Sequence, residues 1–281
     1  MLARVLAPAT GATTVMACVH PSVSALAGAP KYREYEQAIR AEAQARLERA
    51  ARGRPDLDTA DRRVVPGASA AEGLQRLAET EGADLIVVGS THRGPVDRVL
   101  AGSVADRLLQ GAPCAVAVAP VGYGRRAHAA LNVIGVGFDG SPEARIALAG
   151  ACRLAESAGA ALRLILVHAP PTQLSFISEH SGYADLGRWI EDAQRHTLSE
   201  TLHSLPATLR AEGELLVADP GEALAAESQQ LDLLVLGSRA YGPVRRVLLG
   251  GVSSELMRRA ACPILVTPRG VVQPLGTLTT P

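Results

Sequence analysis

Two stretches of the chain carry glycines at matching positions and are suited to hold a phosphate group. They read GSTHRGPVDRVLAGS from Gly89 to Ser103 and GSRAYGPVRRVLLGG from Gly237 to Gly251. Each follows an apolar run that predicts a strand and leads into a segment of helical period. A glycine after a strand allows close approach to the backbone, and the first turn of a helix offers unpaired N–H groups. The pattern therefore indicates a phosphate-binding loop in each half.

The residues of these stretches also have purely structural interpretations. Ser103 suits the N-cap of a helix, a role that serine fills in many proteins that bind no nucleotide. Gly94-Pro95 and Gly242-Pro243 suit simple turns. The spacing alone leaves both roles open.

A carboxylate in the sequence DGSPE is a second candidate for ligand binding. Ser141 and Pro142 predict the N-cap and first residue of a helix, so Asp139 lies at the end of the preceding strand. In a doubly wound sheet that strand faces the strand ending at Gly237 across the topological switch point, where ligands of such sheets bind. We therefore expect Asp139 and Gly237 to border one crevice.

The same region contains GVGFDG, Gly135 to Gly140, which matches the dinucleotide motif GxGxxG. A dinucleotide site also needs an acidic residue at the end of the next strand, which here reads Val167-His168-Ala169. A nicotinamide cofactor is therefore disfavoured. We interpret His168 and its counterpart His20 as packed or turn-bonded imidazoles that border the crevice.

The chain contains one unit twice. The offset of the glycine stretches, 237 − 89 = 148, also relates Asp84 to Asp232 and Cys114 to Cys262. In each unit, apolar runs alternate with longer segments of helical period, which predicts βαβ crossovers, an α/β fold and a mainly parallel sheet. The predicted strands are Val15–Val19, Arg62–Val65, Asp84–Val88 and Ala115–Val118, then Val133–Gly137, Leu162–Val167, Glu214–Val217, Asp232–Leu236 and Ile264–Val266. The predicted helices include Lys31–Arg52, Pro142–Ala158, Leu186–Leu205, Glu222–Gln229 and Val252–Ala260.

The first unit lacks the counterpart of the strand before Asp139. Subtracting the offset, 139 − 148, gives −9, so Met1–Thr10 correspond to Ala149–Ala158 inside the first helix. In a doubly wound sheet the first strand lies near the middle, flanked by others. We expect that residues precede Met1 in the natural chain, that the first unit is incomplete, or that another segment fills the place.

Composition shifts divide the chain into two domains. Residues 1–120 form the first, and residues 121–131, which read VGYGRRAHAAL without periodicity, form a linker. Residues 132–269 form the second domain, and residues 270–281 form a tail without charge or periodicity.

Charge and cysteine usage exclude several classes of protein. Lys plus Arg and Asp plus Glu number 28 each, so no net field attracts nucleic acid or an anionic membrane. No stretch approaches the length of a membrane span. The four cysteines form no CxxC and no zinc-finger spacing with histidine, which predicts reduced, mostly buried thiols and a cytoplasmic location. We expect no metal site built by the chain itself.

Both units resemble universal stress protein domains. The motifs that carry the resemblance are VGFDGSPEARIAL, ADLIVVGS with LDLLVLGS, the two glycine stretches, and APCAVAVAP with ACPILVTP. The resemblance covers all but the linker and tail. It implies two tandem flavodoxin-like units with five-stranded sheets and helices on both faces, the first truncated at its N-terminus. It also implies a pseudo-twofold axis through their last strands.

In the nucleotide-binding branch of that family, the loop reads G-x2-G-x9-G-[S/T] and an Asp after the first strand holds the nucleoside. The second unit keeps that Asp and the outer glycines, but Ala240 stands at the second glycine and Gly251 at the hydroxyl position. The first unit has His92 at the second glycine and lacks the Asp strand.

The resemblance thus implies ATP or AMP, with Mg²⁺ accompanying ATP, in a site that is weak in the second unit and incomplete in the first. Loss of one charge-assisted phosphate hydrogen bond costs about 1.5–3 kcal/mol. The site residues that it implies are Asp139, Ala169, Leu236, Gly237, Ala240, Gly250, Gly251 and Val252 in the second unit, and Gly89, His92, Gly102, Ser103 and Val104 in the first.

Three functions stay open at this point. The first is a cytoplasmic stress-response protein that binds an adenine nucleotide and acts through conformation or partners. The second is a nucleotide-independent interaction scaffold with degenerate loops, and the third, an ATP hydrolase, lacks a Walker lysine and any catalytic constellation. We expect an intramolecular pseudo-dimer of the two units, with a homodimer or a regulatory protein as the external partner and no nucleic acid or membrane. Trp189, in the long second helix of the second unit, is interpreted as a core or subunit-contact residue.

Overall fold

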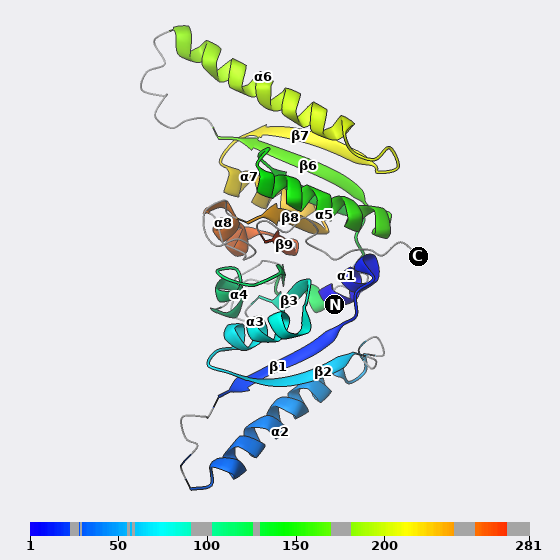
Figure 1. Cartoon of the computed structure of the whole chain (residues 1–281). Coiled ribbons are helices and arrows are strands. Elements are labelled where there is room, and N and C mark those ends of the chain that lie inside the picture. The colour runs from blue at the N-terminus through cyan, green and yellow to red at the C-terminus, as the bar shows by residue number, and fades with distance from the viewer. Residues whose placement is uncertain are drawn as a thin grey trace.

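The computed structural model describes residues 1–22, 28, 30–54, 57, 60–90, 103–125, 130–169, 181–238 and 251–268. Within them, strands form a seven-stranded and a two-stranded sheet, and helices cover both faces (Figure 1). The first half contains α1 (Leu2–Thr10), β1 (Val15–Pro21), α2 (Tyr32–Ala51), β2 (Asp61–Gly67), α3 (Ala70–Glu81), β3 (Leu85–Gly89), α4 (Ser103–Leu108) and β4 (Ala115–Ala119). The second half contains β5 (Val133–Phe138), α5 (Pro142–Ala158), β6 (Ala161–His168), α6 (Ser181–His203), β7 (Ala211–Val217), α7 (Pro220–Glu227), β8 (Leu233–Gly237), α8 (Gly251–Arg259) and β9 (Ile264–Thr267). The 3-10 turns η3 (Tyr123–Arg125) and η5 (Ser228–Gln230) complete these elements.

The helices begin and end where local chemistry sets them. α5 starts after Ser141, whose hydroxyl accepts a hydrogen bond from the Ala144 N–H at 3.1 Å. Pro142 fills its first position, where its missing N–H costs nothing. The helix ends at Gly159 in the left-handed conformation, with φ of 66°. Both ends lie where the sequence predicts them.

The second half forms a complete doubly wound sheet. Its strand order is β7-β6-β5-β8-β9, all parallel, with β5 between β6 and β8. Helices α5 and α6 pack on one face, and α7 and α8 on the other. Because the chain leaves β5 toward β7 on one side and returns to β8 on the other, the topological switch point lies between β5 and β8.

The two halves join through their last strands. β4 pairs with β9 antiparallel, with Ala117 opposite Leu265 at the centre of the register. These two residues are repeat counterparts, since 265 − 117 = 148. The register thus places a local pseudo-twofold axis between them, as the resemblance implies. Two apolar cores, one on each face of the sheet, run through both halves.

The first half lacks a central strand in the part of the chain that the structure describes. β3 and β4 extend the large sheet, while β1 and β2 pair only with each other in a separate sheet. The register of the repeat predicts this break, because the counterpart of β5 would precede Met1. Within residues 1–281, the described strands of the first half thus include no counterpart of β5.

Two residues of the predicted linker belong to the apolar core. Tyr123, within η3, and Leu131, just before β5, are both buried in the core that contains α1 and α5. A segment with glycine, arginine and no periodicity gave no sign of this packing. The two side chains pack in the core that α1, β4 and β5 share. Such packing depends on tertiary contacts, which a local sequence pattern does not show.

Candidate functional site

The switch point of the second half brings the predicted ligand-binding residues together. β5 and β8 are adjacent and parallel, so Asp139 and Gly237 lie at the same edge of the sheet. A Cβ added to Gly237 would lie 2.6 Å from the carbonyl carbon and oxygen of Glu143 and 3.0 Å from the Ala144 nitrogen. The end of β8 therefore packs directly against the first turn of α5, beside the Asp139 turn.

Asp139 presents a carboxylate at this edge of the sheet. Its Oδ1 accepts a hydrogen bond from the Ser141 N–H at 2.9 Å, which fixes the turn into α5. Gly140 adopts the left-handed conformation with φ of 79°. The residue is exposed, so its carboxylate can also accept a hydrogen bond from a ligand hydroxyl or amine.

Ser238, directly after β8, is a candidate that the sequence reasoning missed. It is 4% exposed, and its Oγ is buried with no hydrogen-bond partner among the described residues. Its backbone N–H donates to the Thr267 carbonyl oxygen at 3.1 Å, and the Thr267 hydroxyl donates to the Leu236 carbonyl oxygen at 3.3 Å. These bonds hold the backbone of Ser238 in place, while the described residues offer its hydroxyl no partner.

The same arrangement occurs in the first half. Ser90 follows Gly89 at the end of β3, its N–H donates to the Ala119 carbonyl oxygen at 2.8 Å, and its Oγ is also buried without a partner. The signal was present in the sequence as the repeated Gly-Ser after the fourth predicted strand. The sequence pattern predicts a role for the glycine of each Gly-Ser pair but none for the serine.

The other predicted contact residues of the second half fall on the expected elements. Leu236 is buried in β8, Ala169 is exposed directly after β6, and Gly251 and Val252 begin α8. No heavy atom lies within 4 Å of the Cβ position of Gly251, so packing does not require glycine there. Ala240 and Gly250 lie outside the described residues.

The first half places fewer of its predicted residues. Gly89 ends β3, and Ser103 and Val104 begin α4, while His92 and Gly102 lie outside the described residues. No heavy atom lies within 4 Å of the Cβ position of Gly89. The turn that would face it, the counterpart of Asp139 to Ala144, is absent from residues 1–281.

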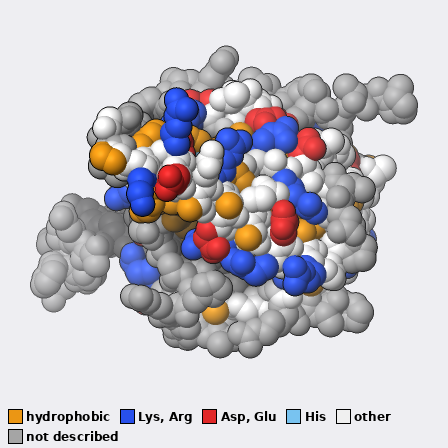
Figure 2. Space-filling model, turned by 90° about the horizontal axis from the view of Figure 1, so that it is seen from below, with side chains coloured by type: hydrophobic (Ala, Val, Ile, Leu, Met, Phe, Trp, Pro, Cys, Tyr) orange, Lys and Arg blue, Asp and Glu red, His pale blue; other side chains and the backbone are white. Residues whose placement is uncertain are grey.

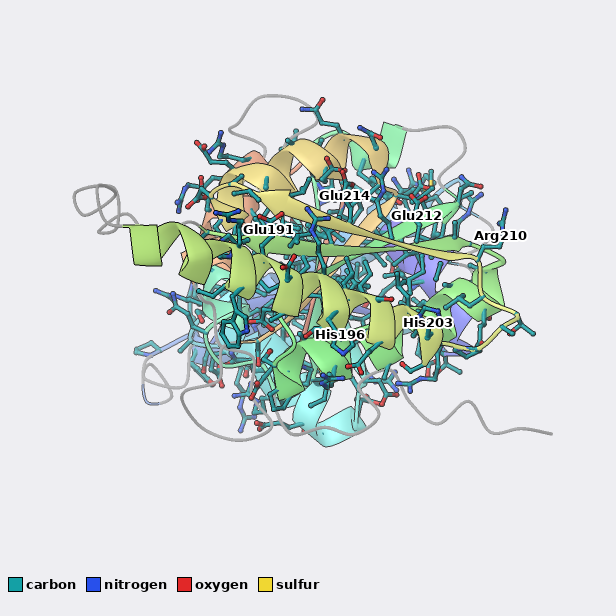
Figure 3. The ribbon with its side chains drawn as sticks, turned by 90° about the horizontal axis from the view of Figure 1, so that it is seen from above. Glu191, His196, His203, Arg210, Glu212 and Glu214 are labelled. Carbon is teal, nitrogen blue, oxygen red and sulfur yellow. The ribbon has the colours of Figure 1, made fainter. Side chains whose placement is uncertain are left out.

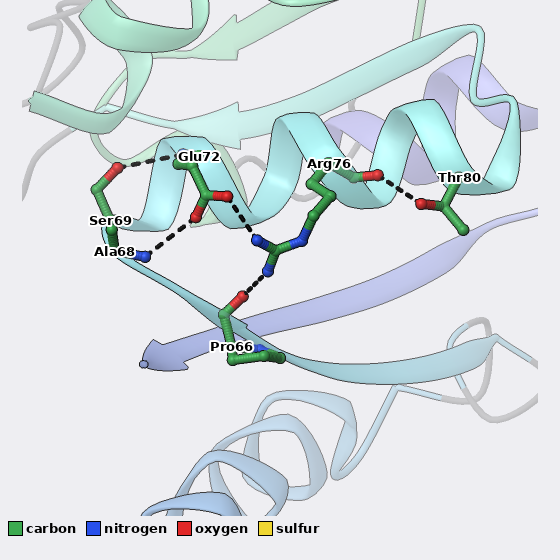
Figure 4. Close-up of polar contacts among 6 residues, drawn as sticks. All are labelled: Pro66, Ala68, Ser69, Glu72, Arg76 and Thr80. Carbon is green, nitrogen blue, oxygen red and sulfur yellow. Dashed lines mark hydrogen bonds and ion pairs between the residues drawn. The ribbon is translucent and has the colours of Figure 1, made fainter. Parts of the chain in front are cut away.

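A separate cavity of about 480 Å³ lies between the end of β2 and α3. The Ser69 hydroxyl accepts from the Glu72 N–H at 3.2 Å, Glu72 accepts from the Ala68 N–H at 3.0 Å, and Arg76 pairs with Glu72 at 2.6 Å (Figure 4). The Arg76 guanidinium also donates to the Pro66 carbonyl oxygen. The side chains of Ser69, Glu72 and Arg76 thus bond to one another and to the backbone. We interpret them as groups that stabilise the start of α3.

Polar side chains also gather along α6 and β7, where Figure 3 labels six of them. His196 pairs with Glu200 at 3.1 Å and Arg195 with Glu191 at 2.6 Å, both one helical turn apart. His203 lies 2.7 Å from the Ser199 carbonyl oxygen. The described residues contain no group of three His, Cys, Asp or Glu side chains able to hold a metal ion. This surface is a solvated helix face with i,i+4 pairs.

The opposite face, over α2, mixes both charges. Figure 2 shows Lys and Arg side chains interspersed with Asp and Glu. Glu42 pairs with Arg46 and Arg49 at 3.1 Å, and Arg63 with Glu81 at 2.7 Å. Hydrogen bonds from the two arginines lower the pKa of the Glu42 carboxyl. Paired opposite charges create no single-signed field on this face.

The histidines and cysteines have structural surroundings. His20 is buried, and its Nδ1 lies 3.0 Å from the Pro21 carbonyl oxygen, the turn-bonded role expected of it. None of the four cysteines, all of which the structure describes, forms a disulfide bond, and Cys114, Cys152 and Cys262 are buried. Burial raises the pKa of the Cys114 thiol to about 12 and that of Cys152 to about 11. No helix among the described residues is long and apolar enough to cross a bilayer.

Comparisons with known proteins agree with this architecture. The sequence model of the universal stress protein family matches residues 2–120 and 131–268. A universal stress protein of Mycobacterium tuberculosis is 30% identical over 205 residues, which cover 71% of this chain and 69% of that protein. One of Thermus aquaticus is 34% identical over 131 residues, 46% of this chain and 93% of that protein.

Solved structures show the same fold at low sequence identity. A universal stress protein from Archaeoglobus fulgidus has a TM-score of 0.63 at 18% identity, covering 95% of this chain and 94% of that one. A structure described as a universal stress protein from Pseudomonas aeruginosa has a TM-score of 0.60 at 17% identity, covering 95% and 98%. Both neighbours match across the two halves.

Proposed function

Because the chain belongs to the universal stress protein family, we propose that it binds an adenine nucleotide at the switch point of its second half. The nucleotide is ATP or AMP, with Mg²⁺ accompanying ATP. In this proposal the protein acts in the cytoplasm in a stress response, through conformation or a partner protein. The observation that carries the proposal is the unsatisfied Ser238 hydroxyl beside the exposed carboxylate of Asp139.

The chemistry of the crevice suits a nucleotide in two respects. The free Oδ2 of Asp139 is an acceptor for a ribose hydroxyl or an exocyclic amine, groups that a nucleoside carries. The Ser238 hydroxyl is a donor held in place by its backbone, and a ligand oxygen would satisfy it. Glycine at position 237 lets the first turn of α5 pack directly on the end of β8, which keeps the Asp139 turn beside Ser238.

The affinity is expected to be low. Gly251 provides no hydroxyl at the start of α8, and packing does not explain its lack of a side chain. Loss of a charge-assisted phosphate hydrogen bond corresponds to roughly a ten- to hundredfold loss of affinity. We therefore expect a dissociation constant for the nucleotide on the order of 100 µM.

Calorimetric titration with ATP and AMP, with and without Mg²⁺, tests this proposal. We expect one site per chain. Asp139→Asn keeps an acceptor for the Ser141 N–H but removes the charge, so it weakens binding about tenfold while the turn stays intact. Ser238→Ala weakens binding about fivefold, and the matched control Ser90→Ala in the first half has no effect. No heat up to millimolar nucleotide, from a chain shown to be folded, would exclude the proposal.

A nucleotide-independent scaffold is the second candidate. Trp189 on α6 is 68% exposed, so its interpretation as a core residue is wrong and a contact role remains. A large exposed aromatic side chain is typical of protein interfaces. The scaffold is supported if the titration shows no nucleotide binding and Trp189→Ala abolishes an interaction that the folded chain otherwise makes.

A further inference from the structure

A second buried serine lies close to Ser238 in the chain's packing, at the start of α8. Ser238 is 4% exposed, and Ser253, on the first turn of α8, is 6% exposed. The described residues offer neither hydroxyl a hydrogen-bond partner. Buried polar side chains are hydrogen-bonded in the great majority of cases, so each unpaired hydroxyl needs an explanation. A bound ligand oxygen explains both together.

Both serines lie on the face of the sheet that α8 covers. Side chains alternate along a strand, and Leu234 and Leu236 of β8 belong to the apolar core that includes residues of α8, so Ser238 continues that face. The repeat counterpart of Ser253, since 253 − 148 = 105, is Ala105, which is buried in the same core. The two hydroxyls therefore lie on one face of the sheet, at the end where β8 stops and α8 begins.

The start of α8 adds further donors for an anion. The helix has nine residues, and the N–H groups of its first turn carry the positive end of the helix dipole. No heavy atom lies within 4 Å of the Cβ position of Gly251, so no described side chain or backbone closes this end of the helix. Two serine hydroxyls and the helix N–H groups are together suited to the terminal oxygens of one phosphate group.

The spacing of the strands favours a single phosphate. Asp139 follows β5 and Ser238 follows β8, and adjacent strands lie about 4.8 Å apart. The ribose hydroxyls and the 5′-phosphate of one nucleotide are separated by a comparable distance. A nucleoside held by Asp139 therefore brings its first phosphate to the two serines.

Further phosphates gain little from the described residues. They would extend beyond the two buried serines, and Gly251 offers them no hydroxyl. The charged residues of the turn into α5, Asp139 and Glu143, are both acidic. Each additional phosphate charge therefore increases repulsion without adding a hydroxyl donor.

We propose that this site selects a nucleoside monophosphate, and that Ser253 binds its phosphate together with Ser238 and the first N–H groups of α8. The inference rests on the nucleotide site proposed above and narrows its ligand from ATP or AMP to AMP. Ser253 supplies the hydroxyl that is missing at position 251.

Titration calorimetry of the full chain with AMP, ADP and ATP tests the selectivity. We expect AMP to bind about fivefold more tightly than ATP, with ADP between them, and Mg²⁺ to leave the affinity for AMP unchanged. Binding of ATP that equals or exceeds that of AMP, with or without Mg²⁺, would overturn the inference.

The variant Ser253→Ala tests the binding residue. We expect it to weaken AMP binding about fivefold and to leave adenosine binding unchanged, because adenosine has no phosphate. Alanine at the repeat position 105 shows that this core accepts the smaller side chain, and an unchanged urea midpoint verifies that the variant folds. The control Ser199→Ala, on the exposed face of α6, changes neither affinity. An equal loss for AMP and adenosine, or no loss for AMP, contradicts the assignment.

The variant Gly251→Ser tests the same assignment without altering Ser253. The added hydroxyl has open space and lies where outer phosphates would pass, so we expect the affinity for ATP to rise about threefold and that for AMP to stay unchanged. A larger gain for AMP than for ATP would place the single phosphate at residue 251 and overturn the inference. Absence of binding by every adenine compound excludes the proposed function itself, whereas binding without preference for AMP overturns this inference alone.

Discussion

The two halves share one sequence pattern but differ in structure, because among the described residues only the second half has a central strand. Gly237 and Gly89 occupy the same repeat position, yet a side chain at 237 would collide with the backbone of α5, whereas the space at 89 is open. The repeated glycine therefore has a packing role in one half that the described part of the other does not require. Repetition of a glycine motif is not by itself evidence of a ligand.

The same comparison separates local from general effects of the missing strand. Cys114 and Cys262 are repeat counterparts at the starts of β4 and β9, next to the interface between the halves, and both are buried. Cys18, on the unpaired edge of β1, is partly exposed, whereas its counterpart Leu166 is buried. Exposure thus increases beside the missing strand and not throughout the first half.

The largest expected difference is in the rate of thiol labelling, between Cys18 and the buried cysteines. With a pKa of about 12, Cys114 is about one part in ten thousand thiolate at pH 8, and Cys152, with a pKa of about 11, about one in a thousand. Both are also shielded from reagent. We expect iodoacetamide to modify Cys18 at least a hundredfold faster than either, as measured by mass spectrometry of the native chain.

A Cys18→Ser variant serves as the control, since it should remove the fast phase and leave the slow ones unchanged. Equal rates at Cys18 and Cys114 would show that the first half opens as a whole, and would contradict a defect confined to one edge.

The next largest difference is in stability, when alanine replaces Gly237 or its repeat counterpart Gly89. Gly237→Ala forces a Cβ to within 2.6 Å of Glu143 backbone atoms, which cannot move without shifting α5. We expect a loss of about 3 kcal/mol in the free energy of unfolding, measured by urea denaturation. Gly89→Ala meets no atom within 4 Å and should change stability by less than about 0.5 kcal/mol. Equal effects at both positions would mean that Gly89 also packs against a backbone.

Much of the fold was predictable from the sequence, because the signals were local and repeated. The N-cap Ser141, the first-turn Pro142 and the C-cap Gly159 fixed α5 to the residue. The long second helix of the second half begins at Ser181, earlier than the predicted Leu186. The prediction began late because the residues before Leu186 lack an apolar stripe. Strand ends differed by one to three residues, since pairing partners and not propensity decide where a strand stops.

The candidate site was predicted less completely than the fold. Asp139 and Gly237 could be predicted to lie at one edge of the sheet, because the switch point follows from strand order. Ser238 was missed, since an unsatisfied buried hydroxyl is a property of the packed structure and not of spacing. The packing of Tyr123 was missed for the same reason.

The smallest expected difference in stability is between substitutions of Asp232 and of its repeat counterpart Asp84. Asp232→Ala removes two hydrogen bonds to the N–H groups that open β5, and the Val133 N–H is partly shielded from water. We expect a loss of about 2 kcal/mol in the free energy of unfolding. Asp84→Ala removes an exposed carboxylate that makes no hydrogen bond within the described residues, so we expect a change of less than about 0.5 kcal/mol.

Urea denaturation of the two variants measures both costs. Equal costs at the two positions, or a cost near zero for Asp232→Ala, would mean that the hydrogen bonds from Asn132 and Val133 to Asp232 do not hold the start of β5.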